Sequence, residues 1–180
     1  MFFLKYNLGL IHIYTGDGKG KTSASLGLAL RALGHNYKVL LVQFFKFETG
    51  EKNVLSKLPN IDFLQFNAPS DFFVEYNEKV KEETKKKFFS FIKMLEEKIK
   101  YKEYDIIIFD EIIYALHMNL ISEEELKNFI LKKPEKSELI LTGRNYPEII
   151  LNLADYITEM KKIKHPFEEK NIEARKGIEY

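Results

Sequence analysis

Residues 15–22 read Thr-Gly-Asp-Gly-Lys-Gly-Lys-Thr, with Ser23 behind them, and this stretch decides the fold of the chain. It lies between an apolar, β-branched run at residues 10–14 and a leucine- and alanine-rich run that begins at residue 24. Glycines let successive backbone N–H groups point at phosphate oxygens, and a helix start adds partial positive charge. Strand, loop and helix in this order predict a phosphate-binding loop, in which Lys21 neutralises phosphate and the Thr22 hydroxyl contacts Mg²⁺.

The loop departs by one position from the common spacing G-x-x-x-x-G-K-[ST]. Thr15 stands five residues before Gly20, and the first glycine follows at Gly16. A flexible linker rich in glycine and lysine is the alternative to a nucleotide site. The flanking strand and helix patterns favour the nucleotide site, because they supply the context that the motif needs.

Length and composition bound the class of protein. The 180 residues suffice for one core, and we expect residues 1–180 to form a single domain. A net charge of +1 gives no signature of nucleic-acid binding, and the lack of cysteine excludes disulfides and thiolate chemistry. The apolar start is too short for a signal peptide, and no run approaches the roughly 18 apolar residues of a membrane span. We expect a cytoplasmic protein without nucleic-acid or membrane partners.

Strand and helix patterns alternate along the chain. We expect six strands, at residues 8–14, 39–45, 61–66, 104–109, 139–142 and 156–160. Helices are expected between them, at residues 21–34, 53–58, 77–100 and 112–119, from a capping box at Ser122 and Glu125 to before Pro134, and in a short segment that ends at residue 153. This alternation predicts an α/β fold with a largely parallel sheet and helices on both faces.

Ligands of such a sheet collect at the carboxyl ends of its strands. Asp110 and Glu111 end the isoleucine-rich fourth strand, where carboxylates can hold the Mg²⁺ of a nucleotide directly or through water. Spacing does not decide which of the two contacts the metal, and Asp110 as a simple helix N-cap is the alternative. Arg144, beside Gly143 at the end of the fifth strand, is placed to meet phosphate or ribose oxygens.

The residues themselves leave the reaction open. A kinase or an ATPase normally has a group that orients a hydroxyl or a water, and the sequence identifies no such group. None of the four histidines stands in a recognisable ligand or nucleophile pairing. A P-loop ATPase or kinase and a nucleotide-binding regulatory module without turnover are both compatible with these motifs.

Five further motifs follow the glycine loop in order. They are Val42-Gln43-Phe44 with Lys46, Asp110-Glu111-Ile112, Thr142-Gly143-Arg144-Asn145, Ile163-Lys164-His165-Pro166-Phe167 and Ala174-Arg175-Lys176-Gly177-Ile178-Glu179-Tyr180. With these motifs the sequence resembles the P-loop type of ATP:cob(I)alamin (corrinoid) adenosyltransferases from residue 15 to its end. The resemblance implies a three-layer P-loop NTPase (RecA-like) fold.

The resemblance also implies a reaction. The 5′-deoxyadenosyl group of ATP would pass to the cobalt of a reduced corrinoid, such as cob(I)alamin or cob(I)yrinic acid a,c-diamide, and triphosphate would be released. Because Co(I) is already a strong nucleophile, such an enzyme needs positioning and electrostatics and no general base. Mg²⁺, a homodimer and a reductase or flavodoxin-type electron donor are implied in the same way.

Carried over by position, the resemblance assigns roles to individual residues. It implies that residues 16–23 bind the triphosphate, that Thr22 and Glu111 bind magnesium, and that Arg31 lies near the nucleotide. It implies a corrinoid-facing loop at residues 71–76, for which packing under the long helix is the alternative. Lys21, Thr22 and Glu111 would be the catalytic residues. The full set of candidate site residues is Thr15, Gly16, Asp17, Gly18, Lys19, Gly20, Lys21, Thr22, Ser23, Arg31, Phe72, Val74, Asp110, Glu111 and Arg144.

Overall fold

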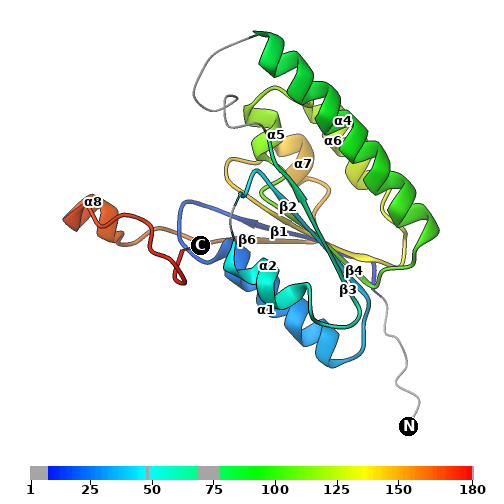
Figure 1. Ribbon diagram of the computed structural model, residues 1–180, viewed down its shortest axis with the longest axis horizontal. Helices are drawn as coiled ribbons and strands as arrows, with labels where there is room; N and C mark the ends of the chain where they lie inside the picture. Colours follow the sequence, from blue (N-terminus) through cyan, green and yellow to red (C-terminus); the bar gives the residue numbers. More distant parts are fainter. Residues whose placement is uncertain (1–7, 48, 69–77, 180) are drawn as a thin grey trace.

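The computed structural model describes residues 8–47, 49–68 and 78–179. These residues form one sheet with helices packed on both of its faces, and a tail that projects to one side (Figure 1). The predicted corrinoid-facing loop at residues 71–76, with Phe72 and Val74, lies outside the described residues.

The sheet has six strands, and every pairing between them is parallel. In chain order the strands are β1 (Ile11–Thr15), β2 (Val39–Phe44), β3 (Ile61–Phe66), β4 (Ile106–Asp110), β5 (Glu138–Thr142) and β6 (Tyr156–Glu159). Their order across the sheet is β3-β2-β4-β5-β1-β6. The predicted parallel sheet is therefore confirmed, and β1 and β4 deliver their carboxyl ends to the same edge.

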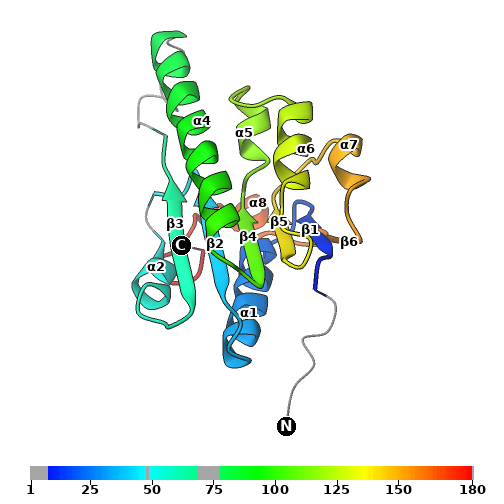
Figure 2. The ribbon, with the colours of Figure 1, turned by 90° about the vertical axis from the view of Figure 1, so that its right-hand side faces the viewer.

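Helices cover the two faces of the sheet separately (Figure 2). One face carries α1 (Lys21–Gly34) and α2 (Gly50–Leu55). The other carries α4 (Glu78–Tyr101), α5 (Tyr114–His117), α6 (Glu123–Leu131) and α7 (Glu148–Leu151). The capping box is confirmed, because Ser122 Oγ accepts from the Glu125 N–H and the Glu125 carboxylate accepts from the Ser122 N–H. The last helix, α8 (Pro166–Lys170), belongs to the tail.

Several predicted boundaries are wrong by two or three residues, and those of β1, α2 and α5 are examples. β1 begins at Ile11 and not at residue 8, because the Gly9 and Leu10 N–H groups donate to the Glu138 carboxylate instead of to a neighbouring strand. α2 begins at Gly50 and not at residue 53. α5 is shorter than residues 112–119, since Glu111 and Asn119 adopt positive φ and turn the chain at both sides of it.

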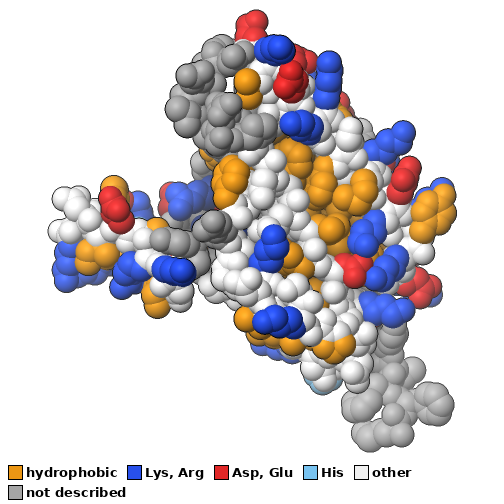
Figure 3. All heavy atoms as spheres, in the orientation of Figure 1, with side chains coloured by type: hydrophobic (Ala, Val, Ile, Leu, Met, Phe, Trp, Pro, Cys, Tyr) orange, Lys and Arg blue, Asp and Glu red, His pale blue; other side chains and the backbone are white. Residues whose placement is uncertain are grey.

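Two apolar clusters hold the sheet between its helix layers. Every residue of β2 is buried, so its side chains alternate between a cluster under α4 that contains Phe88 and Leu95 and a cluster under α1 that contains Ala29 and Ala32. Each large side chain buried in this way stabilises the fold by roughly 1.5–3 kcal/mol. Figure 3 shows hydrophobic side chains gathered near the middle of one face, with charged side chains around them. None of the helices among the described residues combines the length and apolarity needed to cross a bilayer.

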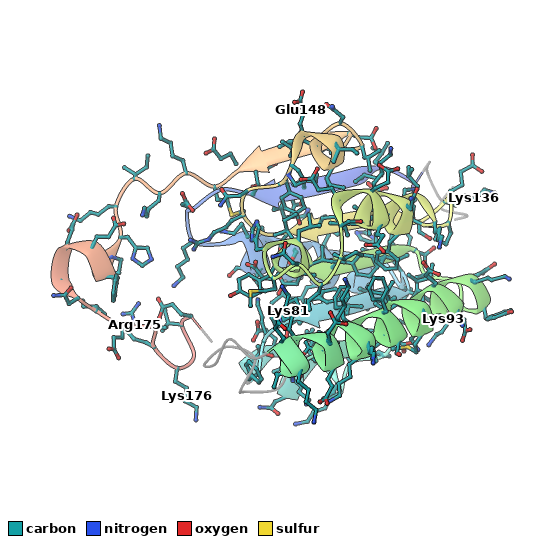
Figure 4. The ribbon with its side chains drawn as sticks, turned by 90° about the horizontal axis from the view of Figure 1, so that it is seen from above. Lys81, Lys93, Lys136, Glu148, Arg175 and Lys176 are labelled. Carbon is teal, nitrogen blue, oxygen red and sulfur yellow. The ribbon has the colours of Figure 1, made fainter. Side chains whose placement is uncertain are left out.

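The tail runs past the glycine loop as it leaves the sheet. Met160 N donates to Thr15 O at 2.8 Å, and Gly18 N donates to Met160 O at 2.6 Å. Helix α8 is the part of the tail that lies farthest from the sheet, and Arg175 and Lys176 lie between α8 and the body of the protein (Figure 4). The tail thus contacts the glycine loop directly after the end of β6.

Candidate nucleotide site

The glycine loop joins the carboxyl end of β1 to the first turn of α1, as the sequence predicts. Gly16 and Gly20 adopt φ of 94° and 116°, which favour glycine. A Cβ atom at Gly16 or Gly18 would lie within 2.6 Å of the Met160 carbonyl oxygen, so no other residue fits at either position. Glycine therefore fixes both the curvature of the loop and its close approach to the tail.

Lys21 lies at the centre of the loop. Its side chain is buried, and its Nζ donates to the carbonyl oxygens of Gly16 at 2.7 Å and Gly18 at 2.9 Å. Burial, assisted by the positive charge of Arg144, lowers the pKa of Lys21, while nearby carboxylates act in the opposite direction. The lysine is therefore aimed into the concave side of the loop, where it can meet a phosphate.

Thr22 and Asp110 meet between the loop and β4. Thr22 Oγ1 donates to Asp110 Oδ1 at 2.9 Å, and Asp110 is fully buried. Thr142 Oγ1 donates to the same carboxylate oxygen at 2.6 Å, and Gln43 Nε2 donates to the other at 3.2 Å. Asp110 does not cap a helix, since α5 begins at Tyr114 after Ile113, so the N-cap alternative is wrong.

Glu111 follows Asp110 in an unusual backbone conformation. Its φ of 65° lies in the left-handed region, which a residue with a Cβ atom seldom adopts, and its N–H donates to both oxygens of Thr142. Burial raises the pKa of the Glu111 carboxyl, and the negative charge of Asp110 raises it further. Lys46, Lys21 and Arg144 partly oppose this rise. The second carboxylate therefore lies within electrostatic reach of the first and of the lysine in the loop.

We expect Glu111→Gln to unfold at a higher temperature than the wild type at neutral pH. The folded state disfavours the ionised carboxyl, so the wild type loses stability as pH rises from the ordinary Glu pKa of 4.5 through the raised one. The difference should therefore shrink towards zero in acid, where both side chains are neutral. Thermal unfolding over a pH series measures it.

The matched control is Glu148→Gln, on an exposed residue that points away from the body (Figure 4). Its unfolding free energy should change by no more than about 0.5 kcal/mol at any pH. A difference for Glu111→Gln that is independent of pH, or of the opposite sign, would contradict the interpretation.

Lys46 is a residue of this site that the sequence identifies only as part of a motif, without a role. Its Nζ lies 2.6 Å from Asp110 Oδ2 and donates to Thr22 Oγ1 at 2.8 Å. Gln43 and Thr142, which position Asp110, were likewise predicted only as parts of motifs. The available signal is that all three stand at or just beyond the carboxyl ends of β2 and β5, the strands on either side of β4.

The donor set suits a magnesium ion held together with a nucleotide. Among the described residues no three His, Cys, Asp or Glu side chains cluster to form an all-protein metal cage. Thr22 and Asp110 supply hard oxygen atoms, and Mg²⁺ is commonly bound by one or two such groups together with substrate phosphates. The ammonium of Lys46 against the same oxygens shows that this position favours a cation.

The remaining candidates differ in how close they lie to the loop. Arg144 Nη1 lies 3.4 Å from Asp17 Oδ1, and both side chains are exposed, so this pair adds little stability and leaves the guanidinium accessible. Ser23 and Arg31 are exposed on α1. Arg31 is ten residues beyond Lys21, or about 15 Å along the helix. Burial raises the pKa of Tyr14, just before the loop, and the positive charge of Arg31 opposes this rise, so a place for Arg31 near the nucleotide stays a prediction.

A cleft of about 320 Å³ opens between the loop and the tail. Its lining consists of Gly18, Lys19, residues 161–166 and Glu179. Lys19 Nζ lies 2.8 Å from Glu179 Oε1, which holds the end of the tail beside the loop. Figure 3 shows Lys and Arg side chains gathered on the tail, so this side of the loop is suited to anionic groups.

Comparisons with known proteins extend over nearly the whole chain. A sequence model described as ATP:corrinoid adenosyltransferase BtuR/CobO/CobP matches residues 7–180. A corrinoid adenosyltransferase of Escherichia coli K12 is 32% identical over 174 residues, which cover 96% of this chain and 86% of the relative. A corrinoid adenosyltransferase of Sinorhizobium sp. is 34% identical over 185 residues, which cover 96% and 80%.

A solved structure agrees with the architecture. The flagellar accessory protein FlaH from Methanocaldococcus jannaschii superposes with a TM-score of 0.57 at 21% identity, covering 84% of this chain and 70% of that chain. This likeness concerns the fold alone and agrees with the predicted α/β architecture of a parallel sheet with helices on both faces. Because the family match spans the glycine loop, the acidic pair and the tail, the chain belongs to the ATP:corrinoid adenosyltransferase family.

Proposed function

We propose that this protein transfers the 5′-deoxyadenosyl group of ATP to the cobalt of a reduced corrinoid, such as cob(I)alamin or cob(I)yrinic acid a,c-diamide, and releases triphosphate. Family membership supports the reaction, and the relatives named above are corrinoid adenosyltransferases. The observation that carries the proposal is the arrangement of the glycine loop, Lys21 and the Thr22–Asp110 pair at one edge of the sheet.

The geometry suits a displacement at a sugar carbon with a polyphosphate leaving group. The electron pair of Co(I) forms the bond to C5′ while the bond from C5′ to the triphosphate oxygen breaks and its electrons leave with the triphosphate. Lys21, which the loop carbonyl oxygens hold in place before reaction, and the loop N–H groups other than that of Gly18, which donates to Met160 O, would stabilise the charge that develops on the leaving group. Thr22 and Asp110 would hold Mg²⁺, which supplies further neutralisation on the same phosphates, with Glu111 beside them.

Turnover tests the proposal. Purified protein, Mg-ATP and a chemically reduced corrinoid should yield a light-sensitive adenosylcorrinoid and triphosphate in equal amounts. Release of ADP instead would identify a kinase or an ATPase. Tight retention of ATP without any corrinoid-dependent change in absorbance would identify a regulatory module.

We also propose a homodimer of single-domain chains that works in the cytoplasm with a reductase or flavodoxin-type electron donor. The sheet edge supports the dimer: β6 is the outermost strand beside β1, all four of its residues are exposed, and Tyr156 and Ile157 expose about half of their surface. An exposed apolar edge strand is normally covered by another surface. The electron donor and the roles of Phe72 and Val74 rest on the family resemblance.

A further inference from the structure

Lys46 lies where the two oxygen ligands of the proposed metal site face each other. Its ammonium is 2.8 Å from Thr22 Oγ1 and 2.6 Å from Asp110 Oδ2, while Thr22 Oγ1 itself lies 2.9 Å from Asp110 Oδ1. In P-loop proteins the hydroxyl after the loop lysine and the acidic residue at a strand end hold Mg²⁺ between them. The ammonium therefore contacts the same two side chains that a magnesium ion would require.

The backbone turn before Lys46 returns the side chain to the edge of the sheet. Phe45 has a φ of 58°, and its N–H donates to Phe66 O at 2.8 Å. Its ring packs edge-on against Phe66 and Tyr114, with ring centroids 5.5 and 5.3 Å apart. Gln65 Nε2 donates to the Lys46 carbonyl oxygen at 3.4 Å. Packing and hydrogen bonds other than those to Thr22 and Asp110 thus help to set the position of the lysine.

Charge explains why a cation stays at this position. Asp110 is fully buried at the end of β4, and a buried carboxylate is costly unless it is paired. Lys46 is 23% exposed at its side chain, so it can pair with Asp110 and still swing outward on its flexible stem. Two cations cannot share the space between the same oxygens, because they repel each other and compete for the same lone pairs.

We propose that Lys46 is a tethered cation that holds Thr22 and Asp110 in place and excludes free Mg²⁺, so that the metal enters as its complex with nucleotide. A dication arriving alone must expel the ammonium into water. A dication arriving with a triphosphate brings oxygen atoms that can receive the expelled ammonium. This inference rests on the magnesium site that is part of the proposed function.

Binding of Mn²⁺ alone to the nucleotide-free protein tests the exclusion. We expect Lys46→Met to bind Mn²⁺ at least about tenfold more tightly than the wild type, and Lys46→Arg, which keeps the charge, to bind no more tightly than the wild type. Lys52→Met removes a charge from an exposed position of α2 and should leave Mn²⁺ affinity unchanged. Equal Mn²⁺ affinity of the wild type and a folded Lys46→Met variant would overturn the proposal.

A second measurement on the wild type keeps the test decisive if Lys46→Met does not fold. The NMR signal of the Lys46 side chain, assigned by comparison with Lys46→Arg, should shift when Mg-ATP is added and stay in place with the same concentration of Mg²⁺ alone. A shift with Mg²⁺ alone would overturn the proposal. Neither measurement uses a corrinoid, so a failure here is distinguishable from a failure of adenosyl transfer.

Discussion

Replacing Lys21 by alanine is expected to lower kcat/KM for adenosyl transfer by about a hundredfold or more. The loss follows because the ammonium is fixed by two loop carbonyl oxygens before the substrate arrives, and removal of such a preorganised charge is felt chiefly in the transition state. The fold should survive, since the two apolar clusters that hold the sheet do not include this side chain.

Turnover and thermal unfolding of the same preparation check this expectation. Lys57→Ala, at an exposed position beyond α2, is the matched control for loss of one lysine and should retain wild-type turnover. A Lys21→Ala variant that no longer unfolds cooperatively would mark the residue as structural. One that kept full turnover would remove the loop lysine from the mechanism.

Asp110→Asn is expected to abolish the Mg²⁺ dependence of ATP binding and to lower turnover by about a hundredfold or more. The amide has nearly the shape of the carboxylate but lacks its charge. Its NH₂ group replaces one of the two oxygens, so either Thr22 and Thr142, which share Oδ1, or Lys46, which contacts Oδ2, lose their acceptor. Loss of the buried charge pair should also destabilise the fold by about 3 kcal/mol, the lower end of the usual range, because Lys46 is 23% exposed and can reach water.

ATP affinity with and without Mg²⁺ provides the measurement. In the wild type the metal should strengthen binding, and in Asp110→Asn the two affinities should converge. Glu111→Gln serves as the comparison, because it changes the neighbouring carboxylate of the same edge. If Glu111→Gln and not Asp110→Asn removes the metal dependence, the principal metal ligand is Glu111, as the family resemblance implies.

The sequence predicts the elements of this site better than their contacts. The glycine loop and Asp110 could be found because each stands where a buried strand ends, and parallel strands bring such ends to one edge. Lys46 could not be placed, since its position depends on the left-handed turn at Phe45 and on the aromatic rings that hold this turn. The choice between Asp110 and Glu111 could not be made from spacing either, because it depends on the Thr22 contact of Asp110 and on the left-handed turn at Glu111.

The tail is a further example of a contact that local patterns do not contain. The pattern of the tail predicts only a polar terminus. In the structure, however, Gly18 N donates to Met160 O, and Glu179 forms an ion pair with Lys19. Partners 142 and 160 residues apart in the chain meet only because β6 lies beside β1. Gly16 and Gly18 are therefore needed partly because the Met160 carbonyl oxygen of the tail lies too close to them for a Cβ atom.

The placement of β1 between β5 and β6 has a consequence for biosynthesis. Strand β1 leaves the ribosome first, but its partners come last: His12 pairs with Ile140 on one side and with Tyr156 on the other. Until these late segments emerge, β1 has no neighbour to accept its hydrogen bonds, and such high contact order slows folding. A nascent chain stalled before residue 138 would carry the complete phosphate loop without the strands that support it, and would be exposed to proteases and aggregation.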